Sequence, residues 1–417
     1  MIPTEMDGFI GSAVAAESIL DATTILHGPG GCRIHLSRLS SRYVKREFNT
    51  REGSYFFHFD RVPCTYIDSD DYIYGAARKV SMVLDILEQD DTKFATIIQS
   101  PGASLIGDKL KDEVIGKGLD DTTLVLDTSF MSRDFSEGYD TTMTRIVSKL
   151  TAPGEKMKGT ANIIGLPFTS RGYYRFLREL RSVLGVMGIE VIAAVGTSCT
   201  LDEIRKSAHA EYNICIMPEY CRNLADYYEK ELGIPTVVCP MGAPIGFRAM
   251  ESFVRAIGDS FDKSPERILP ILEDEMEDLR ITLRASLDVG EKLRYKTFSI
   301  SGESSVVYPL CDFMIGYLRM VPLSIVLTEK DPVFEKKIQD LLRQVDCLPA
   351  LSTEFAASYT NVLFGPGSYV KLLQAQGRCG IGVDISLPSQ DMIDYSPKSI
   401  MGLEGFRIML DGLLNSR

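Results

Sequence analysis

A glycine-rich turn between a β-branched run and a helical pattern constrains the fold of this chain most. Residues 23–26, Thr-Thr-Ile-Leu, form the β-branched and apolar run that a buried strand requires. His27 is followed by Gly28-Pro29-Gly30-Gly31, which favours a tight turn whose backbone can approach a ligand closely. Apolar residues then recur at helical spacing after Cys32. The segment therefore predicts a strand, a turn and a helix, with Cys32 at the helix N-terminus.

The position of Cys32 has two interpretations. The free N–H groups and the dipole at a helix N-terminus favour a thiolate or another anion. A glycine turn beside a buried thiol explains the same residues equally well. The spacing alone does not decide between these interpretations.

Composition limits the classes of protein to which the chain can belong. A length of 417 residues with 45% hydrophobic residues suits two or three α/β domains. The net charge of −12, without a basic run, argues against a nucleic-acid binder. No apolar run approaches the roughly 20 residues of a membrane span, and the N-terminus has no basic start. We therefore expect a cytoplasmic protein that binds neither nucleic acid nor a membrane.

The nine cysteines are scattered, odd in number and without a CxxC pair. This pattern is not a disulfide framework, a zinc site or a ferredoxin-type cluster motif. If the chain holds an iron–sulfur cluster, the ligands come from distant segments or from two chains.

Strand and helix patterns alternate along the chain, which predicts parallel, doubly wound sheets. We expect an N-terminal α/β domain over residues 1–150, a second over 151–292 and a third over 293–417. Within the second, Thr200 and Glu203 have the spacing of a capping box. In the first, apolar spacing predicts one helix over residues 72–88, preceded by acidic residues that complement its N-terminus.

The segment His27–Cys32, HGPGGC, resembles the HGPxGC signature of the nitrogenase component 1 family. That family includes nitrogenase, its cofactor-assembly scaffold, the dark-operative reductases of chlorophyll synthesis and the reductive cyclase of coenzyme F430 synthesis. The similarity continues through Leu105–Asp108 and Pro218–Pro235 to the closing segment at 381–406. The resemblance implies three Rossmann-like domains with parallel β-sheets flanked by helices, dimeric assembly and an iron–sulfur cluster at a subunit interface. It also implies a separate ATP-dependent reductase of the nitrogenase iron-protein type.

The chain departs from the family at two of the three expected cluster cysteines. Those positions fall on Asp7 and Pro101, so that only Cys32 remains. An aspartate ligand is known in the chlorophyll-synthesis relatives, which makes Asp7 a candidate, although Asp7 also suits a helix cap. Cys64 is a second-choice ligand. The resemblance therefore predicts a [4Fe–4S] cluster shared with another chain, with Cys32, Asp7 and Cys64 as metal ligands.

Further site residues are predicted near the glycine turns. His35 and Arg38 follow Cys32 by one or two helical turns and could orient an anionic substrate or supply a proton. A solvated helix face explains them as well. The turn at 365–368 could offer N–H groups to an anion, or could be an ordinary tight turn. The predicted cofactor-contacting residues are His27, Gly28, Gly30, Gly31, Gly102, Gly365 and Gly367.

Three functions follow from the resemblance. The chain could be an oxidoreductase subunit that passes low-potential electrons to a substrate, of which a tetrapyrrole is one candidate. It could instead be a metallocofactor assembly scaffold, or a structural partner subunit. We find no GxxxxGK[ST] or GxGxxG motif, in agreement with ATP hydrolysis on another chain. Both a homodimer and a heterodimer or heterotetramer with another component 1-like chain are open.

Overall fold

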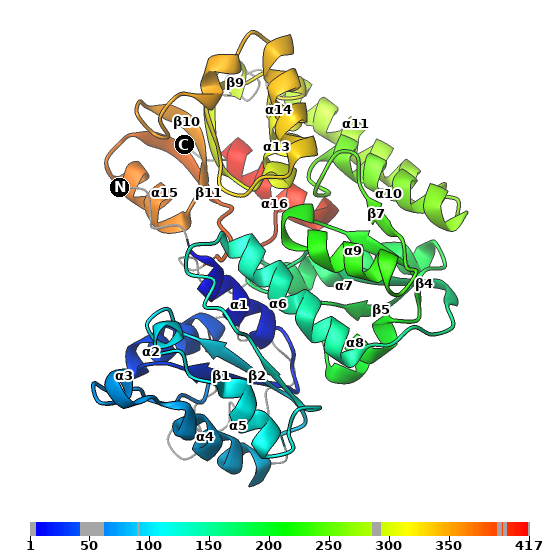
Figure 1. The fold of residues 1–417 in the computed structure, drawn as a ribbon. Helices are drawn as coiled ribbons and strands as arrows, with labels where there is room; N and C mark the ends of the chain where they lie inside the picture. Colours follow the sequence, from blue (N-terminus) through cyan, green and yellow to red (C-terminus); the bar gives the residue numbers. More distant parts are fainter. Residues whose placement is uncertain are drawn as a thin grey trace.

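The computed structural model describes residues 6–41, 62–89, 92–285, 293–389, 394 and 398–415. It contains three parallel β-sheets flanked by helices, which confirms the predicted α/β fold class (Figure 1). Each sheet lies inside one of the three predicted domain ranges, whose boundaries stay predictions. Among the described residues, no helix is both long and apolar enough to cross a membrane.

The first sheet has the order β1-β2-β3 and carries the glycine-rich turn. Its strands are β1 (Thr23–His27), β2 (Ala95–Gln99) and β3 (Thr123–Val125). All residues of β1 are buried, as the β-branched run predicted, and all residues of β2 are buried as well. The accompanying helices are α1 (Gly8–Glu17), α2 (Gly30–Ser41), α3 (Asp71–Tyr74), α4 (Ala77–Gln89), η2 (Ala103–Leu105), α5 (Leu110–Gly116) and α6 (Phe135–Leu150).

The second sheet has the order β5-β4-β6-β7, as in a doubly wound fold. Its strands are β4 (Met157–Ile164), β5 (Glu190–Ala194), β6 (Ala210–Cys215) and β7 (Thr236–Val238). The helices are α7 (Tyr173–Val186), α8 (Leu201–Ser207), η3 (Pro218–Tyr220), α9 (Arg222–Lys230), α10 (Phe247–Phe261) and α11 (Leu269–Ala285). The predicted capping box is present at the start of α8, where Thr200 and Glu203 bond each other's backbone N–H groups.

The third sheet has the order β11-β10-β8-β9. Its strands are β8 (Thr297–Gly302), β9 (Val321–Leu327), β10 (Thr360–Gly365) and β11 (Cys379–Asp384). The helices are α13 (Ser304–Gly316), α14 (Pro332–Gln344), η4 (Leu348–Leu351), α15 (Gly367–Ala375) and α16 (Gly402–Asn415). One hydrophobic core runs through the second and third sheets and includes residues of α1 and α6.

Helices α1 and α6 cross where the first sheet meets the rest of the molecule (Figure 1). The crossing is unusually close because glycines lie on both helices. A Cβ atom on Gly11 would lie 2.0 Å from the carbonyl oxygen of Phe135, and one on Gly138 would lie 2.0 Å from that of Gly8. The contact therefore requires glycine on both sides.

The predicted single helix over residues 72–88 is wrong in one respect. The structure divides this stretch into α3 and α4 at Gly75, whose φ is +90°. The Asp108 carboxylate accepts the Ala76 N–H at 3.0 and 3.2 Å, which places the start of α4 against a distant loop. A tertiary hydrogen bond thus overrides the local helical pattern.

Candidate functional site

The glycine-rich turn connects the carboxyl end of β1 to the first turn of α2. The N–H of Gly28 donates to Thr65 Oγ1 at 3.0 Å, and a Cβ on Gly28 would lie 2.6 Å from Ser100 Oγ. Around Gly31, in contrast, a Cβ would meet no atom of the described residues within 4 Å. The turn is therefore packed tightly at its beginning and open beside Cys32.

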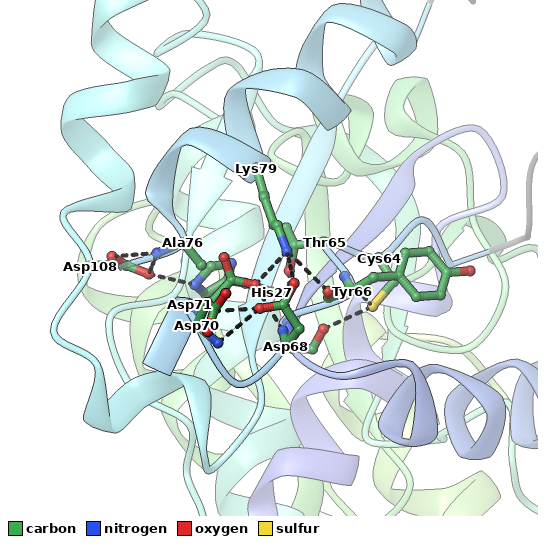
Figure 2. Close-up of polar contacts among 11 residues, drawn as sticks. His27, Cys64, Thr65, Tyr66, Asp68, Asp70, Asp71, Ala76, Lys79 and Asp108 are labelled. Atoms are coloured by element: carbon green, nitrogen blue, oxygen red, sulfur yellow. Dashed lines mark hydrogen bonds and ion pairs between the residues drawn. The ribbon is translucent and has the colours of Figure 1, made fainter. Parts of the chain in front are cut away.

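His27 anchors this turn from inside the domain (Figure 2). Its side chain is fully buried, and its Nε2 hydrogen-bonds Asp108 Oδ2 at 3.1 Å. Burial lowers the pKa of His27, while the Asp108 carboxylate opposes this shift. The imidazole thus links the start of the glycine-rich turn to the loop that carries Asp108.

Cys64 belongs to the loop that packs beneath the turn. Its thiol donates to the carbonyl oxygen of Gly28 at 3.1 Å and accepts the N–H of Tyr66 at 3.4 Å (Figure 2). The residue is buried. As a metal ligand Cys64 would lose its proton and with it the bond to Gly28, whereas its sulfur could still accept the N–H of Tyr66. In this structure its thiol supports the turn, and its role as a ligand stays a prediction.

The acidic residues before α3 are occupied by a lysine and by backbone groups (Figure 2). Lys79 Nζ contacts Asp68 Oδ2 at 3.0 Å and also contacts the Asp71 carboxylate. Asp68 Oδ1 accepts the N–H of Asp70 at 3.0 Å. The hydrogen bond from Lys79 lowers the pKa of Asp68. This cluster therefore stabilises the loop that carries Tyr66.

The thiol of Cys32 is half-buried at the first turn of α2. Burial raises the pKa of this thiol, which opposes the helix dipole that the sequence suggested would favour a thiolate. Three residues on, the side chain of His35 is exposed. Arg38 belongs to α2, but its side chain lies outside the described residues.

The other predicted site residues belong to different elements from Cys32. Asp7 caps α1, where its Oδ1 accepts the N–H of Ile10 at 3.2 Å. Gly102 adjoins the hydroxyl of Tyr72 in the first domain. Gly365 and Gly367 belong to the third sheet, at the end of β10 and the start of α15.

These positions allow a test of whether the chain fits an iron–sulfur cluster. Within the described ranges, no three or more His, Cys, Asp or Glu side chains form a group that could hold a metal ion. Cys32 offers a partly accessible thiol beside open space, whereas Cys64 and Asp7 already have hydrogen-bond partners. A cluster thus fits the described residues only as a group to which a second chain contributes ligands.

Apolar side chains are exposed on two adjoining segments of the first domain, α3 and η2, where a Cβ on Gly102 would lie 3.0 Å from the Tyr72 hydroxyl oxygen. Their exposed fractions are 73% for Ile73, 84% for Tyr74 and 81% for Leu105. Tyr66 is half-exposed and carries the Arg33 guanidinium 5.5 Å from its ring centroid. We call Ile73, Tyr74 and Leu105 the apolar patch. Exposed apolar groups that cluster in this way are typical of a docking surface.

A second polar centre was not predicted from the sequence. Glu219, Glu303 and Glu329 follow the carboxyl ends of β6, β8 and β9, and their side chains are mostly buried. No motif marks these residues, because they come from separate segments. The only signal available was that each lies just after a predicted strand, where α/β proteins place their sites.

Comparison with known proteins decides the family. Residues 8–416 match the nitrogenase component 1 type oxidoreductases. The chain belongs to this family. It is therefore an oxidoreductase of the nitrogenase component 1 type, and the resemblance noted in the sequence is confirmed.

Relatives from several organisms support the assignment. The nitrogenase iron-iron protein beta chain of Rhodobacter capsulatus is 23% identical over 78% of this chain and 72% of its own length. The nitrogenase molybdenum-iron protein beta chain of Methanococcus maripaludis is 21% identical over 98% and 92%, respectively. One subunit of the light-independent protochlorophyllide reductase of Gloeobacter violaceus is 24% identical over 62% and 50%.

The fold agrees with a solved structure of nitrogenase. The structure of nitrogenase Cp1 at pH 6.5 superposes with a TM-score of 0.79 over all of this chain and 92% of the other. Its sequence is only 16% identical, so the similarity concerns the fold alone.

Proposed function

We propose that this chain is the substrate-reducing component of a nitrogenase-like complex in the cytoplasm. In this proposal a separate ATP-dependent reductase of the iron-protein type delivers low-potential electrons. The observation that carries the proposal is the position of Cys32, which is half-buried in a strand–turn–helix segment. The turn of this segment is packed tightly at its beginning and is open at Gly31. Family membership over residues 8–416 supports it.

Cys32 is the proposed ligand of an iron–sulfur cluster, of the [4Fe–4S] type, shared between two chains. When bound, such a cluster supplies one-electron transfer at low potential. Two copies of Cys32 give two thiolates, and Asp7 from each chain is the candidate for the remaining ligands. To act so, Asp7 would leave its cap on α1, which removes the hydrogen bond to the N–H of Ile10.

The remaining residues of the turn have supporting roles in this proposal. His27 and Cys64 hold the turn by their bonds to Asp108 and to Gly28. Gly30 and Gly31 leave the backbone N–H groups accessible to an anionic group. His35 is exposed one turn from Cys32 and is a candidate for orienting an anion or supplying a proton, as is Arg38.

We assign the apolar patch to docking of the reductase. The patch lies on α3 and η2, and η2 follows the loop in which the N–H of Ser100 bonds the His27 carbonyl oxygen at the start of the Cys32 turn. A reductase bound there would bring its electron donor close to Cys32. Its burial against a partner removes apolar surface from water, which stabilises the complex.

The substrate is proposed more broadly. Several relatives are subunits of light-independent protochlorophyllide reductase, whose named substrate is a tetrapyrrole. A tetrapyrrole is therefore the first substrate class to test, beginning with binding measured by absorbance and fluorescence quenching.

The central experiment measures iron and acid-labile sulfide, with EPR of the dithionite-reduced protein, after purification without oxygen. We expect about four irons per dimer, and we expect loss of the iron and of the EPR signal in Cys32→Ala. Cys347→Ala is a matched control because Cys347 is also partly exposed but lies in the third domain. An iron-free wild type that gains none on reconstitution would refute the proposal.

One observation favours a second function. Because no group of three or more ligands is found in the described residues, the chain could be the structural partner of a component 1-like chain that supplies the other cysteines. Co-purification separates the two cases: a homodimer with iron supports catalysis, and iron only in a mixed dimer supports the partner role. An assembly scaffold would instead release its cluster to an acceptor protein.

A further inference from the structure

An interdomain pocket lies between the second and third sheets. Its wall is mostly apolar, with Phe176, Met217 and Val306 among its residues, and it also contains Ser170 and Glu303. The pocket has a volume of about 40 Å³, which is enough for a few water molecules or for one end of a small molecule. Ser170 is only 7% exposed, and its hydroxyl has no hydrogen-bond partner in the described part of the chain. An unpaired buried hydroxyl in a pocket points to a ligand.

An acidic cavity of about 580 Å³ lies at the junction of all three sheets. Its charged lining residues are Asp134, Glu137, Asp140, Glu219, Arg222, Glu329 and Lys330. Five carboxyl groups thus face two basic side chains. This cavity is polar, unlike the interdomain pocket.

Glu303 lies between the two spaces. It contributes to the wall of the interdomain pocket and accepts a hydrogen bond from the Tyr220 hydroxyl at 3.0 Å. Glu219, the neighbour of Tyr220 in η3, lines the acidic cavity. Glu219 is held in place by Ser304 Oγ at 2.6 Å, Ser305 N at 2.8 Å and Ser305 Oγ at 2.7 Å.

The surroundings of Glu303 favour its protonated form. Burial, with the negative charges of Glu219 and Glu329, raises the pKa of Glu303 to about 8, against the lowering effect of the Tyr220 hydrogen bond. Burial likewise raises the pKa of Glu329 to about 7 and that of Asp140 to about 6. The pKa of Glu303 is thus raised above those of Glu329 and Asp140 in the cavity lining, which favours a protonated Glu303 at neutral pH.

The titratable and charged groups around Glu303 come from every element packed against it. They are Glu219, Tyr220 and Arg222 in or near η3, Asp140 on α6, Glu329, Lys330 and Asp331 after β9, Asp384 at the end of β11, and Arg171 and Tyr173 before or on α7. Of the cations, Arg171 pairs with Asp394 and Arg222 pairs with Asp331, while Lys330 lines the acidic cavity beside Glu329. Within the described residues, none of the three forms an ion pair with Glu303.

We propose that Glu303 carries protons from the acidic cavity to a small molecule bound in the interdomain pocket beside Ser170. The proton leaves the Glu303 carboxyl group for an atom of that molecule which has gained electron density from an external low-potential one-electron donor. The carboxylate then regains a proton from solvent through the acidic cavity, with Tyr220 and Glu219 on the route. This inference rests on the proposed reductive function, which supplies the electrons.

The pocket also indicates the class of molecule. Its wall is mostly apolar, and its polar lining includes Glu303, the Ser170 hydroxyl, Arg171 and Asp384. Arg171 already pairs with Asp394, and the Asp384 carboxylate accepts hydrogen bonds from Ser386 and Ser389. A neutral, unsaturated group with a hydrogen-bond acceptor therefore fits beside Glu303 and Ser170, because the charged side chains of the wall already have partners.

Infrared spectroscopy of the isolated full-length protein tests the relay without reductase or cluster. We expect a protonated-carboxyl C=O band that is present at pH 6, titrates with a midpoint near 8 and is lost in Glu303→Gln. Glu329→Gln should shift the midpoint down, since it removes a neighbouring negative charge. After transfer into D₂O, Tyr220→Phe should slow the isotope shift of the band. Ser170→Leu, which fills the pocket, should move the band frequency.

Glu251→Gln is the control, because Glu251 pairs with Arg255 on the exposed face of α10. Absence of the band in the wild type, or its persistence in Glu303→Gln, would overturn the inference. An isotope shift at the wild-type rate in both Tyr220→Phe and Glu219→Gln would also overturn it. If Glu303→Gln does not fold, the band midpoint in Glu329→Gln tests the inference instead, and an unchanged midpoint would overturn it. A normal band in an iron-free protein would refute the proposed function alone, whereas normal iron binding without the band would refute only the relay.

Discussion

The crossing of α1 and α6 makes a sharp prediction for Gly138→Ala. The new Cβ would lie 2.0 Å from the carbonyl oxygen of Gly8 and 2.6 Å from its carbonyl carbon and Cα. These are backbone atoms, so no rotamer change relieves the overlap and α1 must move away. That movement also stretches the hydrogen bond from the N–H of Gly8 to the Arg133 carbonyl oxygen, now 2.8 Å.

The magnitude follows from these contacts. Overpacking costs about 1–3 kcal/mol, and a lost backbone hydrogen bond costs about 1 kcal/mol. Alanine recovers about 0.5–1 kcal/mol through its better helix propensity. We therefore expect a net loss of about 2 kcal/mol in the free energy of unfolding, or roughly 4–8 °C in Tm for a unit of 150–250 residues.

The assay is thermal unfolding followed by circular dichroism, with Gly185→Ala as the matched control. Gly185 lies in α7, and a Cβ there meets no described atom within 4 Å. The same substitution should therefore raise the free energy of unfolding by about 0.5–1 kcal/mol. Equal Tm values for Gly138→Ala and the wild type would refute the close crossing of α1 and α6.

Two further predictions concern the turn and the buried acid. Gly28→Ala should lower the iron content, because its Cβ would lie 2.6 Å from Ser100 Oγ and displace the turn. Adding Ser100→Gly to this variant should partly restore the iron content. An unchanged iron content in Gly28→Ala would contradict this reasoning. The pKa of Glu303 is raised to about 8, so the folded state binds more protons than the unfolded state and stability falls as pH rises towards 8. Glu303→Gln should therefore raise Tm at pH 9 with little effect near pH 5, and equal effects at both would count against the shift.

Features that depend on neighbours in the chain were predictable from the sequence. The β-branched run and the glycine turn gave β1 and the start of α2, because strand and turn preferences act over a few residues. The Thr200–Glu203 capping box was predicted for the same reason. The cap on α1 at Asp7 was one of two interpretations, and the structure shows the hydrogen bond that this interpretation requires.

Features that depend on distant segments required the tertiary structure. His27 and Asp108 are 81 residues apart, and this pair, with Asp108 also bonding the N–H of Ala76, separates α3 from α4.

The strongest contrast is between Cys32 and Glu303. Sequence alone determined that a cysteine follows a tight turn and begins a helix, because that arrangement is local. Only the tertiary structure placed Glu303 between an apolar pocket and an acidic cavity, with Glu219 bonded to a serine 86 residues away. A proton affinity depends on burial and on charges brought together by folding, and neither has a period or a motif in the sequence.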